Sequence, residues 1–356
     1  MKVALNTDGL YTTQAGTARY IRGLVPGLHK LASPGLEFFE LAWPVENFGY
    51  GQPERWLKTF YLELVWARFL APPRLLKNGA DLLHSTAGCF IDPPNSIRNV
   101  VTLHDLAIER FPDRFRKWQR WSGRRRLRKI DKADRVICIS RFTADEAMKC
   151  LGLPASKLEV VYNGCDFHPS EQTPVEKTPD FEVPPEFFLF VGSLEPGKNL
   201  ALLRESWRLA ESQGRPLPPL LIVGARWEGV EREGQSPKNW RYLGRQPDDV
   251  LVHLYRRTLA LVFPSKYEGF GLPVIEAMAL GAPVICSPVA SLPEVGADAF
   301  LSVALDAASY REAMGRLCRD EALRADLARR GRIQANQFSW EKCARHTVQV
   351  YEQALR

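Results

Sequence analysis

Short apolar runs alternate with helical stretches along this chain, and the alternation runs through twice. Such runs are typical of parallel strands that are covered by helices on both faces of a sheet. We therefore predict an α/β fold built from two successive doubly wound sheets. The apolar runs are VALNT (3–7), LEFFELAW (36–43), ADLLHS (80–85), NVVTLH (99–104), DRVICIS (134–140) and LEVVYNG (158–164), then FFLFVG (187–192), PLLIVGA (219–225), WRYLG (240–244), LALVFPS (259–265) and APVICSP (282–288).

A segment without periodicity separates the two halves. Residues 168–186, HPSEQTPVEKTPDFEVPPE, are rich in Pro, Glu and Thr and are predicted to form a linker. The 356 residues are enough for two domains at about 100–200 residues each. We place one domain at 1–167, a second at 187–337, and a terminal amphipathic helix at 338–356.

The N-terminal residues and the cysteines indicate the cellular compartment. The N-terminal MKVALNTDGL is predicted to be a strand rather than an export signal, and no apolar stretch reaches about 20 residues. The seven cysteines are dispersed and form no CxxC motif. We therefore expect a protein of the reducing cytoplasm without a structural zinc site. The cysteines are Cys89, Cys138, Cys150, Cys165, Cys286, Cys318 and Cys343.

Positive charge is concentrated in one segment. The chain carries a formal charge of +7, while residues 110–132 hold eleven Lys or Arg against two Asp, a local net charge of +9. Trp118 and Trp121 lie within this basic segment. Such a patch can bind nucleic acid, an anionic membrane or a polyanionic substrate, and it can equally be a solvated helix face.

The loop VGSLEPGKN (191–199) directly follows a predicted strand. Free backbone N–H groups at a helix N-terminus, together with the charge of Lys198, would bind a diphosphate. Gly192, Gly197 and Lys198 also match most of a P-loop, but Asn199 stands where a Ser or Thr would ligate magnesium. We therefore favour a diphosphate site over the alternatives of a P-loop and a merely structural turn.

Two glutamates eight residues apart mark the string SKYEGFGLPVIEAMALGAPV (265–284). Glu268 falls in a glycine-rich loop, where its carboxylate can meet sugar hydroxyls, and Gly269 and Gly271 let a ligand approach the backbone closely. Glu276 falls on the helix that follows, where its carboxylate can accept a ribose hydroxyl. The alternative for each residue taken alone is a solvated glutamate.

A histidine follows another predicted strand. His104 in VTLHDL (101–106) would lie at the carboxyl end of that strand, and we predict a functional role for it. The loop QAGTARYI (14–21) opens the first helix, but no GxGxxG follows a predicted strand, so a nicotinamide enzyme is unsupported. We expect structural roles for the other histidines, which are His29, His84, His168, His253 and His346.

Together these motifs resemble the family-four glycosyltransferases of the GT-B fold, a retaining family that includes bacterial mannosyltransferases and sucrose-phosphate-synthase-like enzymes. The resemblance covers nearly the whole chain. Besides the strings above, it rests on SRFTADE (140–146), VVYNGCD (160–166), SLPEV (291–295) and the closing FSWEK with Tyr351.

The resemblance implies two Rossmann-like domains that face a central cleft, with the terminal helix crossing back to the first domain. It implies that Lys198 contacts the donor diphosphate, that Glu268 holds the transferred sugar, and that Glu276 binds the ribose. His104 would lie beside the reaction centre, and Gly16 would line the cleft opposite the phosphates. The implied donor-site residues are Gly16, Gly192, Ser193, Lys198, Gly224, Gly269, Phe270, Gly271, Leu272 and Glu276.

The implied activity is transfer of a hexose, mannose or glucose, from a nucleotide-diphosphate sugar to a hydroxyl of a glycan, a lipid-linked or a small-molecule acceptor. Lys198 and a helix N-terminus would stabilise the departing diphosphate, so we expect neither metal nor cofactor. The strings LPVIEAMA and SLPEV favour GDP-mannose, with UDP- and ADP-sugars open. Two other functions stay open: a nucleotide-sugar-binding module without turnover, and a polyanion- or nucleic-acid-binding protein. A phosphorylase is disfavoured, since no site for a pyridoxal lysine is evident.

Two places depart from the family pattern. Ser193 stands where several relatives carry an Arg beside the diphosphate, and Arg19 and Arg226 are the candidates for supplying that charge. GTARY (16–20) replaces a GIGRY-like loop, so the acceptor is not identified. We expect no nucleic acid as partner, but contact with an anionic membrane at its inner face through Arg114, Arg116, Lys117, Trp118, Trp121, Arg124, Arg125 and Arg126.

Overall fold

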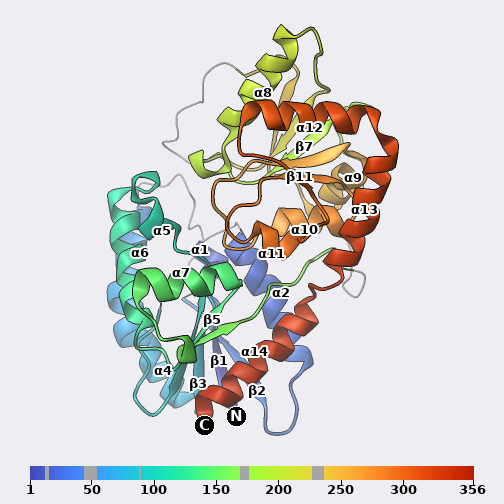
Figure 1. Ribbon diagram of the computed structural model, residues 1–356. Coiled ribbons are helices and arrows are strands. Elements are labelled where there is room, and N and C mark those ends of the chain that lie inside the picture. The colour runs from blue at the N-terminus through green and yellow to red at the C-terminus, as the bar shows by residue number, and fades with distance from the viewer. Residues whose placement is uncertain (13–15, 44–53, 88–89, 169–175, 227–235) are drawn as a thin grey trace. The chain divides into compact units, whose positions relative to one another are not determined.

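The computed structural model describes residues 1–12, 16–43, 54–87, 90–168, 176–226 and 236–356. Its contacts divide the chain into two units, Met1–Gly164 with Trp340–Arg356, and Cys165–Ser339. Each unit contains a six-stranded parallel sheet with helices around it (Figure 1). The predicted α/β fold with two doubly wound sheets is confirmed. Cys89 and residues 169–175 of the predicted linker lie outside the described residues.

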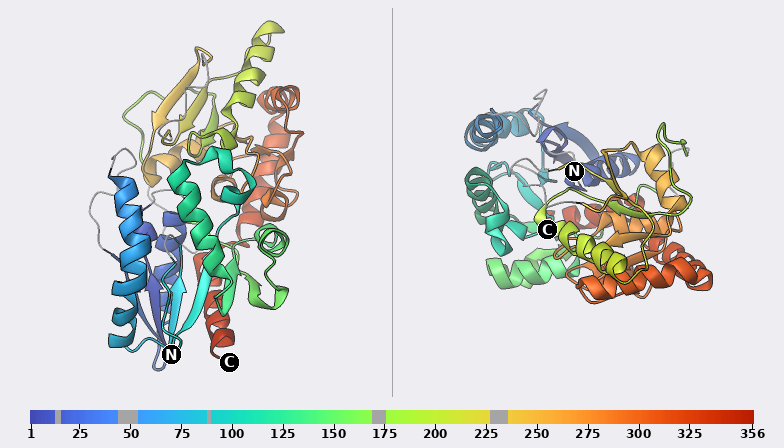
Figure 2. Two further views of the ribbon diagram at one scale, coloured as in Figure 1. Left: turned by 90° about the vertical axis from the view of Figure 1, so that its left-hand side faces the viewer. Right: turned by 90° about the horizontal axis from the view of Figure 1, so that it is seen from above.

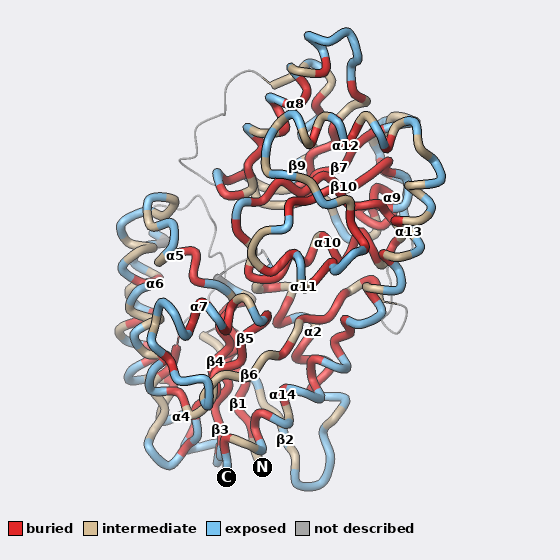
Figure 3. Tube along the Cα trace, viewed as in Figure 1, coloured by how far each residue is buried: buried red, intermediate tan, exposed pale blue. Residues whose placement is uncertain are grey.

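The sheet of the first unit has the strand order β2-β1-β3-β4-β5-β6. All neighbouring strands are parallel, and Lys2 pairs in register with Glu37 on one side while Val3 pairs with Leu82 on the other. The central strands β3 and β4 are buried almost throughout, as the red segments of Figure 3 show. The strands are β1 (Lys2–Asn6), β2 (Glu37–Leu41), β3 (Leu82–Ser85), β4 (Arg98–Leu103), β5 (Arg135–Cys138) and β6 (Leu158–Val160).

Helices cover both faces of this sheet. The terminal helix α14 (Trp340–Leu355) packs against α2 (Gly16–Lys30), β4 and β5, so the C-terminus returns to the first unit. A helical tract of three consecutive elements and α6 (Lys117–Ile130) run side by side (Figure 2). The tract comprises α3 (Arg55–Tyr61), the π-helix η1 (Leu62–Leu70) and α4 (Ala71–Lys77); the remaining helices are α1 (Gly9–Thr12), α5 (Ala107–Arg110), η2 (Pro112–Arg114), α7 (Arg141–Leu151) and η3 (Ala155–Lys157).

The sheet of the second unit has the order β12-β11-β10-β7-β8-β9. Because side chains alternate along a strand, Phe188 and Phe190 face the same side, where they join a core with Trp207. The strands are β7 (Phe188–Val191), β8 (Leu220–Val223), β9 (Trp240–Gly244), β10 (Ala260–Phe263), β11 (Val284–Cys286) and β12 (Leu301–Ser302). The helices are η4 (Pro196–Lys198), α8 (Leu200–Ser212), α9 (Asp248–Arg257), α10 (Leu272–Ala279), α11 (Leu292–Gly296), α12 (Ala307–Arg319) and α13 (Glu321–Ala335).

The first unit boundary falls at Gly164, three residues before the predicted domain end. Cys165 belongs to the second unit, where its Sγ lies 3.8 Å from the carbonyl oxygen of Ile275. Glu176, in the predicted linker, also packs on the second unit: its carboxylate accepts from Arg256 at 2.8 Å and pairs with His253 at 2.9 Å. Part of the predicted linker is therefore anchored to α9.

Candidate active site

The strand order of the second unit brings two loops together. The chain leaves β7 towards β8 on one side, whereas β10 pairs with the other side of β7 and leads away towards β11. In open α/β sheets, ligands bind in the crevice at such a reversal of strand order, outside the carboxyl ends of the strands. The loops that leave β7 and β10 here are 192–199 and 264–271, the two that the sequence predicted to hold a donor.

Lys198 and Glu268 meet at this point. The Nζ of Lys198 donates to Oε1 of Glu268 at 2.5 Å, and the two side chains are 17% and 11% exposed. The same ammonium lies 5.5 Å from the centroid of the Phe263 ring. The backbone links the loops as well, because the N–H of Lys266 donates to the carbonyl of Gly197 at 2.9 Å. The sequence assigned Lys198 and Glu268 to separate parts of a donor, whereas the structure pairs them with each other.

Glu195 directs its carboxylate back into the loop that follows β7. Its Oε2 accepts from the N–H of Gly197 at 2.7 Å and thereby caps η4. A P-loop would offer the N–H groups of such a loop to phosphates. Here a carboxylate already occupies one of them, so this loop is unlike a P-loop.

The loop after β8 packs tightly against the loop after β7. The N–H of Gly192 donates to the carbonyl of Val223 at 3.0 Å. Gly224 has a φ of +144°, and a Cβ at this position would lie 1.8 Å from the carbonyl oxygen of Gly192. Only glycine permits this approach, because any side chain would separate the two loops.

Arg226 lies beside the loop that carries Ser193. Leu194 forms an isolated parallel bridge with Arg226, so the two backbones run side by side. The Arg226 guanidinium lies 5.9 Å from the Tyr242 ring centroid. Of the two arginines proposed to replace a charge at Ser193, Arg226 is therefore the one found in the second unit next to this loop, whereas Arg19 belongs to the first.

Ser291 fixes the glycine-rich loop after β10. Its hydroxyl, which is fully buried, lies 3.0 Å from the carbonyl oxygens of both Glu268 and Phe270 and donates to them. Gly271 caps α10 with a φ of +99°, and a Cβ there would lie 2.7 Å from the side chain of Leu292. Sequence reasoning did not count Ser291 among the site residues; its place in SLPEV was the only signal.

Glu276 lies within the first turns of α10, with only 1% of the residue exposed. The hydroxyl of Tyr255, on α9, donates to its Oε2 at 3.0 Å. The predicted ribose ligand is thus a buried carboxylate oriented by a phenol. Tyr255 was not predicted, because its contact joins α9 to α10, two helices that are separated along the chain by β10.

Nine of the ten predicted donor-site residues belong to the second unit, and Gly16 belongs to the first. Gly269, Phe270, Gly271 and Leu272 are buried along the loop and the start of α10, while Gly192 and Ser193 are half-buried. Gly16 is the exposed first residue of α2. Gln14 and Ala15, in the predicted loop before it, lie outside the described residues.

His104 directly follows β4, as predicted, and is half-buried. Its Nε2 lies 2.9 Å from the carbonyl oxygen of Thr86, and since a carbonyl only accepts, the proton is on Nε2. Burial lowers the pKa of His104 below its usual 6.5, so the ring is neutral near pH 7. Tyr20 packs edge-on against this ring at 4.8 Å between centroids.

His84 has the structural role that was predicted. Its two ring nitrogens lie 2.7 Å from the Tyr351 hydroxyl and 2.8 Å from Thr102 Oγ1. The Tyr20 hydroxyl joins the same Thr102 at 3.0 Å. Burial, and to a lesser extent the neighbouring His104, lowers the pKa of His84 to about 3. This buried chain of hydrogen bonds ties α2 and α14 to the sheet of the first unit.

Asp8, just beyond β1, is a buried carboxylate that the sequence reasoning missed. It accepts from the backbone N–H of Trp43 at 2.7 Å and from Nε1 of Trp66 at 3.2 Å. Burial, and to a lesser extent the nearby Glu63, raises the pKa of Asp8 to about 6, although both hydrogen bonds and Arg126 oppose the shift.

The basic segment 110–132 forms α6 and the turns before it. Arg126 donates to the fully buried Glu63 of η1 at 2.5 Å, and Ser122 donates to the same oxygen at 3.1 Å. Arg110 likewise forms a two-pronged ion pair with Glu146. Some of the basic residues therefore hold the first unit together, because they pair with buried carboxylates.

In the part of the chain that the structure describes, no group of three or more His, Cys, Asp or Glu side chains could hold a metal ion. Within the same residues, no helix is both long enough and apolar enough to cross a membrane.

Comparison with known proteins gives consistent matches. Residues 16–168 match the model of Glycosyltransferase Family 4, and residues 173–334 match that of Glycosyl transferases group 1. The chain is 30% identical to O-antigen chain mannosyltransferase B of Escherichia coli over 99% of this chain and 100% of the relative.

Solved structures resemble the chain in fold. Sucrose-phosphate synthase of Thermosynechococcus elongatus has a TM-score of 0.68 at 19% identity and covers 99% of this chain and 98% of its own. HepE of Anabaena, in complex with UDP-glucose, has a TM-score of 0.67 at 17% identity and covers 99% and 100%.

Proposed function

The chain belongs to glycosyltransferase family 4 and has the GT-B fold, and on that premise we propose that it transfers a hexose from a nucleotide-diphosphate sugar to an acceptor hydroxyl. The observation that carries the proposal is the meeting of Lys198 and Glu268 at the strand-order reversal of the second sheet. A cation for phosphates and a carboxylate for sugar hydroxyls lie there in direct contact.

Lys198 has the chemistry that departure of the diphosphate requires. As the bond from the anomeric carbon to the diphosphate oxygen breaks, negative charge grows on the phosphate, and the ammonium stabilises it. Glu268 holds that ammonium in place, since the pair is mostly buried. When the donor binds, Lys198 has to share its protons between Glu268 and the phosphate oxygens.

Glu268 also binds the transferred sugar in this proposal. Its Oε1 is bonded to Lys198, which leaves Oε2 to accept from sugar hydroxyls. Those hydrogen bonds strengthen as the ring gains positive charge, so they act on turnover more than on binding. Ser291 keeps the loop carbonyls in place behind the carboxylate.

Glu276 and His104 are the two further residues to which we give a role. The carboxylate of Glu276, held by Tyr255, accepts from the donor ribose. His104 of the first unit is a neutral ring whose Nε2 proton is bonded to Thr86, so its Nδ1 can accept a hydrogen bond from a sugar hydroxyl.

The family and the named relative support the reaction and the donor that we propose. We propose retention of the anomeric configuration: the acceptor oxygen attacks from the face that the diphosphate leaves, and the acceptor proton passes to a phosphate oxygen. A mannosyltransferase that is 30% identical over its full length supports GDP-mannose as donor. Lys198 supplies the positive charge in this mechanism, which therefore needs neither a metal ion nor a cofactor. The acceptor hydroxyl belongs to a glycan, and we place the protein in the cytoplasm at the inner face of the membrane.

Thermal-shift screening of nucleotide sugars tests the donor. A ligand at about 100 times its Kd stabilises a protein by about 2.7 kcal/mol, which raises Tm by several degrees. We expect the largest rise with GDP-mannose and none with nucleosides. Failure of GDP-, UDP- and ADP-sugars alike to raise Tm would count against the proposal.

Turnover separates an enzyme from a binding module. With GDP-mannose and a mannosyl glycan, we expect GDP release, an α-linked product by NMR of its anomeric proton, and undiminished rates in excess EDTA. Donor binding without GDP release would identify a binding module. Complete loss in EDTA that magnesium restores would overturn the metal-free mechanism.

A further inference from the structure

The helical tract α3–η1–α4 is apolar on two sides. Its inner side, with Leu62, Trp66 and Leu75, is buried in the core of the first unit. Its outer side exposes a second set, of which Phe69 is 60% exposed and Leu57 is 51% exposed. A surface helix ordinarily presents polar residues to solvent, and contiguous exposed apolar side chains mark interaction sites. The outer set, here termed the apolar stripe, is Trp56, Leu57, Tyr61, Val65, Phe69 and Leu76.

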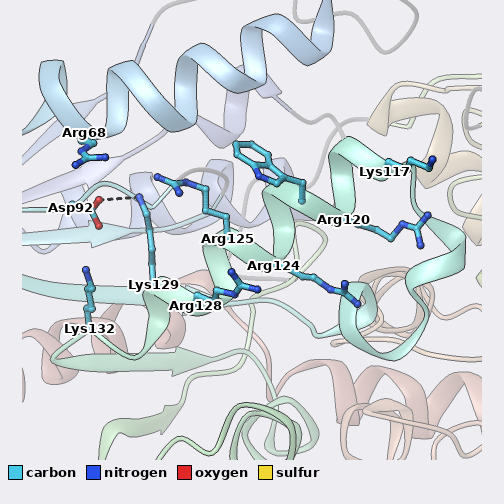
Figure 4. A pocket seen from close by; sticks show the side chains of 10 residues that line it. Arg68, Asp92, Lys117, Arg120, Arg124, Arg125, Arg128, Lys129 and Lys132 are labelled. Atoms are coloured by element: carbon cyan, nitrogen blue, oxygen red, sulfur yellow. Dashed lines mark ion pairs between the residues drawn. The ribbon is translucent and has the colours of Figure 1, made fainter.

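An open groove of about 850 Å³ lies between this tract and α6 (Figure 4). Eight Lys or Arg side chains line it, together with Trp121 and a single acidic residue, Asp92. Asp92 pairs with Lys129 at 3.1 Å, and Arg120 and Arg124 have carboxylates at 3.7 and 3.4 Å. Among the described residues, the other lining cations have no acidic partner; they are Arg68, Lys117, Arg125, Arg128 and Lys132.

The stripe and the groove form one continuous face. Phe60 of α3 stacks on Trp121 of α6, with centroids 4.5 Å apart and planes 13° from parallel. The buried pair of Glu63 and Arg126 joins η1 to α6 a turn further on. Arg68 projects into the groove from the same π-helix that carries Val65 and Phe69 in the stripe. The Arg68 guanidinium lies 5.4 Å from the centroid of the Phe69 ring, so the groove borders the stripe at this point.

We propose that this face docks on an anionic phospholipid bilayer, with lipid phosphates in the groove and the apolar stripe in the interfacial layer. The unpaired cations select an anionic partner, and each basic residue near such a surface contributes about a fivefold gain in binding. The apolar stripe selects an amphiphilic one, since aromatic and aliphatic side chains enter the boundary between headgroups and acyl chains. A nucleic acid would satisfy the cations but leave the stripe in water. Docking of this face does not depend on the transfer chemistry.

Not every basic residue of segment 110–132 belongs to this face. Arg126 is bonded to the buried Glu63, so reversing its charge would damage the fold rather than report on docking. Arg125 and Arg128 line the groove and have no acidic partner in the described chain. Arg125 and Arg128 are therefore the residues to reverse.

Vesicle sedimentation of the full chain tests the proposal, with phosphatidylglycerol vesicles and with pure phosphatidylcholine vesicles. We expect the wild type to bind the first and not the second. Arg125→Glu with Arg128→Glu removes two cations and is expected to weaken binding at least about 25-fold. Leu57→Ser with Phe69→Ser is expected to remove the part of the binding that resists high salt.

Control variants reverse charges and remove an apolar side chain in the second unit. Arg215→Glu with Arg245→Glu reverses two exposed cations of the second unit, and Ile333→Ser removes a side chain that is 56% exposed on α13. Both are expected to bind like the wild type, and circular dichroism checks the fold of every variant. The proposal is overturned if the wild type ignores anionic vesicles, if controls lose binding equally, or if a DNA duplex binds this face while vesicles do not.

Discussion

Replacing Glu268 by Gln is expected to strengthen the binding of a free nucleoside diphosphate while it lowers turnover. In the structure, the Glu268 carboxylate accepts a hydrogen bond from the Lys198 ammonium at 2.5 Å. A diphosphate that binds Lys198 has to compete with that carboxylate and is repelled by it. Glutamine keeps the size of the side chain but removes the charge, so both obstacles disappear.

The size of the effect follows from the burial of the pair. A hydrogen bond to a charged group contributes about 1.5–3 kcal/mol, a factor of about 10–150 in affinity. With side chains only 17% and 11% exposed, screening by water is limited. Lys198→Ala is expected to weaken GDP binding by a similar factor, because it removes a phosphate ligand and leaves the carboxylate unpaired.

A double-mutant cycle measures the coupling. GDP affinity is determined by calorimetry for the wild type, Lys198→Ala, Glu268→Gln and the double variant, with Lys266→Ala as a control for loss of an exposed lysine nearby. The double variant is expected to bind GDP better than Lys198→Ala alone. Effects that add to within about 0.5 kcal/mol would refute the competition between carboxylate and phosphate, as would unchanged GDP binding in Glu268→Gln.

Three further results are expected. Because burial raises the pKa of Asp8 from 3.8 to about 6, the folded state binds a proton more tightly than the unfolded state, and the free energy of unfolding falls as pH rises from about 4 to 6. The Asp8→Asn variant lacks this loss, so between pH 4 and pH 7 its unfolding free energy should rise by up to about 3 kcal/mol relative to that of the wild type. A difference between the two proteins that does not change with pH in urea melts would contradict this. Glu276→Gln should raise the donor KM and weaken free GDP with little change in kcat, with Tyr255→Phe showing the same pattern more weakly; a lower kcat at unchanged GDP affinity would assign Glu276 to the transferred sugar instead. Gly224→Ala should lower Tm and donor affinity together, since its Cβ would lie 1.8 Å from the carbonyl of Gly192, and a wild-type Tm would show that the loops do not need this approach.

The sheets could be predicted because their strands are buried on both faces. Continuous apolar runs, such as those before Gly192 and His104, are typical of such buried strands. Both residues directly follow a strand, as expected. The two-residue strand β12 was too short to leave a pattern. The helical tract 55–77 was missed because Leu62 and Trp66 point inward while Tyr61 and Val65 point outward, which removes the amphipathic contrast on which helix prediction depends.

The contacts within the site could not be predicted from spacing. Lys198 and Glu268 are 70 residues apart, and they meet only because β10 pairs with β7, a neighbour relation that strand patterns do not encode. The same holds for Tyr255 and Glu276 on separate helices. Asp8 was overlooked because its partners, Trp43 and Trp66, come from segments with no motif. The site residues could therefore be predicted from the sequence, whereas their contacts depend on the strand order of the sheet.

The transfer rate of the Lys198→Ala variant tests the central claim most directly. With GDP-mannose and a mannosyl glycan as substrates, we expect the rate of glycoside formation at saturating donor to fall at least about 10-fold in Lys198→Ala, as loss of a charge-assisted hydrogen bond to the leaving group requires. Lys266→Ala should retain the wild-type rate. A Lys198→Ala protein that forms glycoside as fast as the wild type would contradict the assignment of the donor site to the loops after β7 and β10.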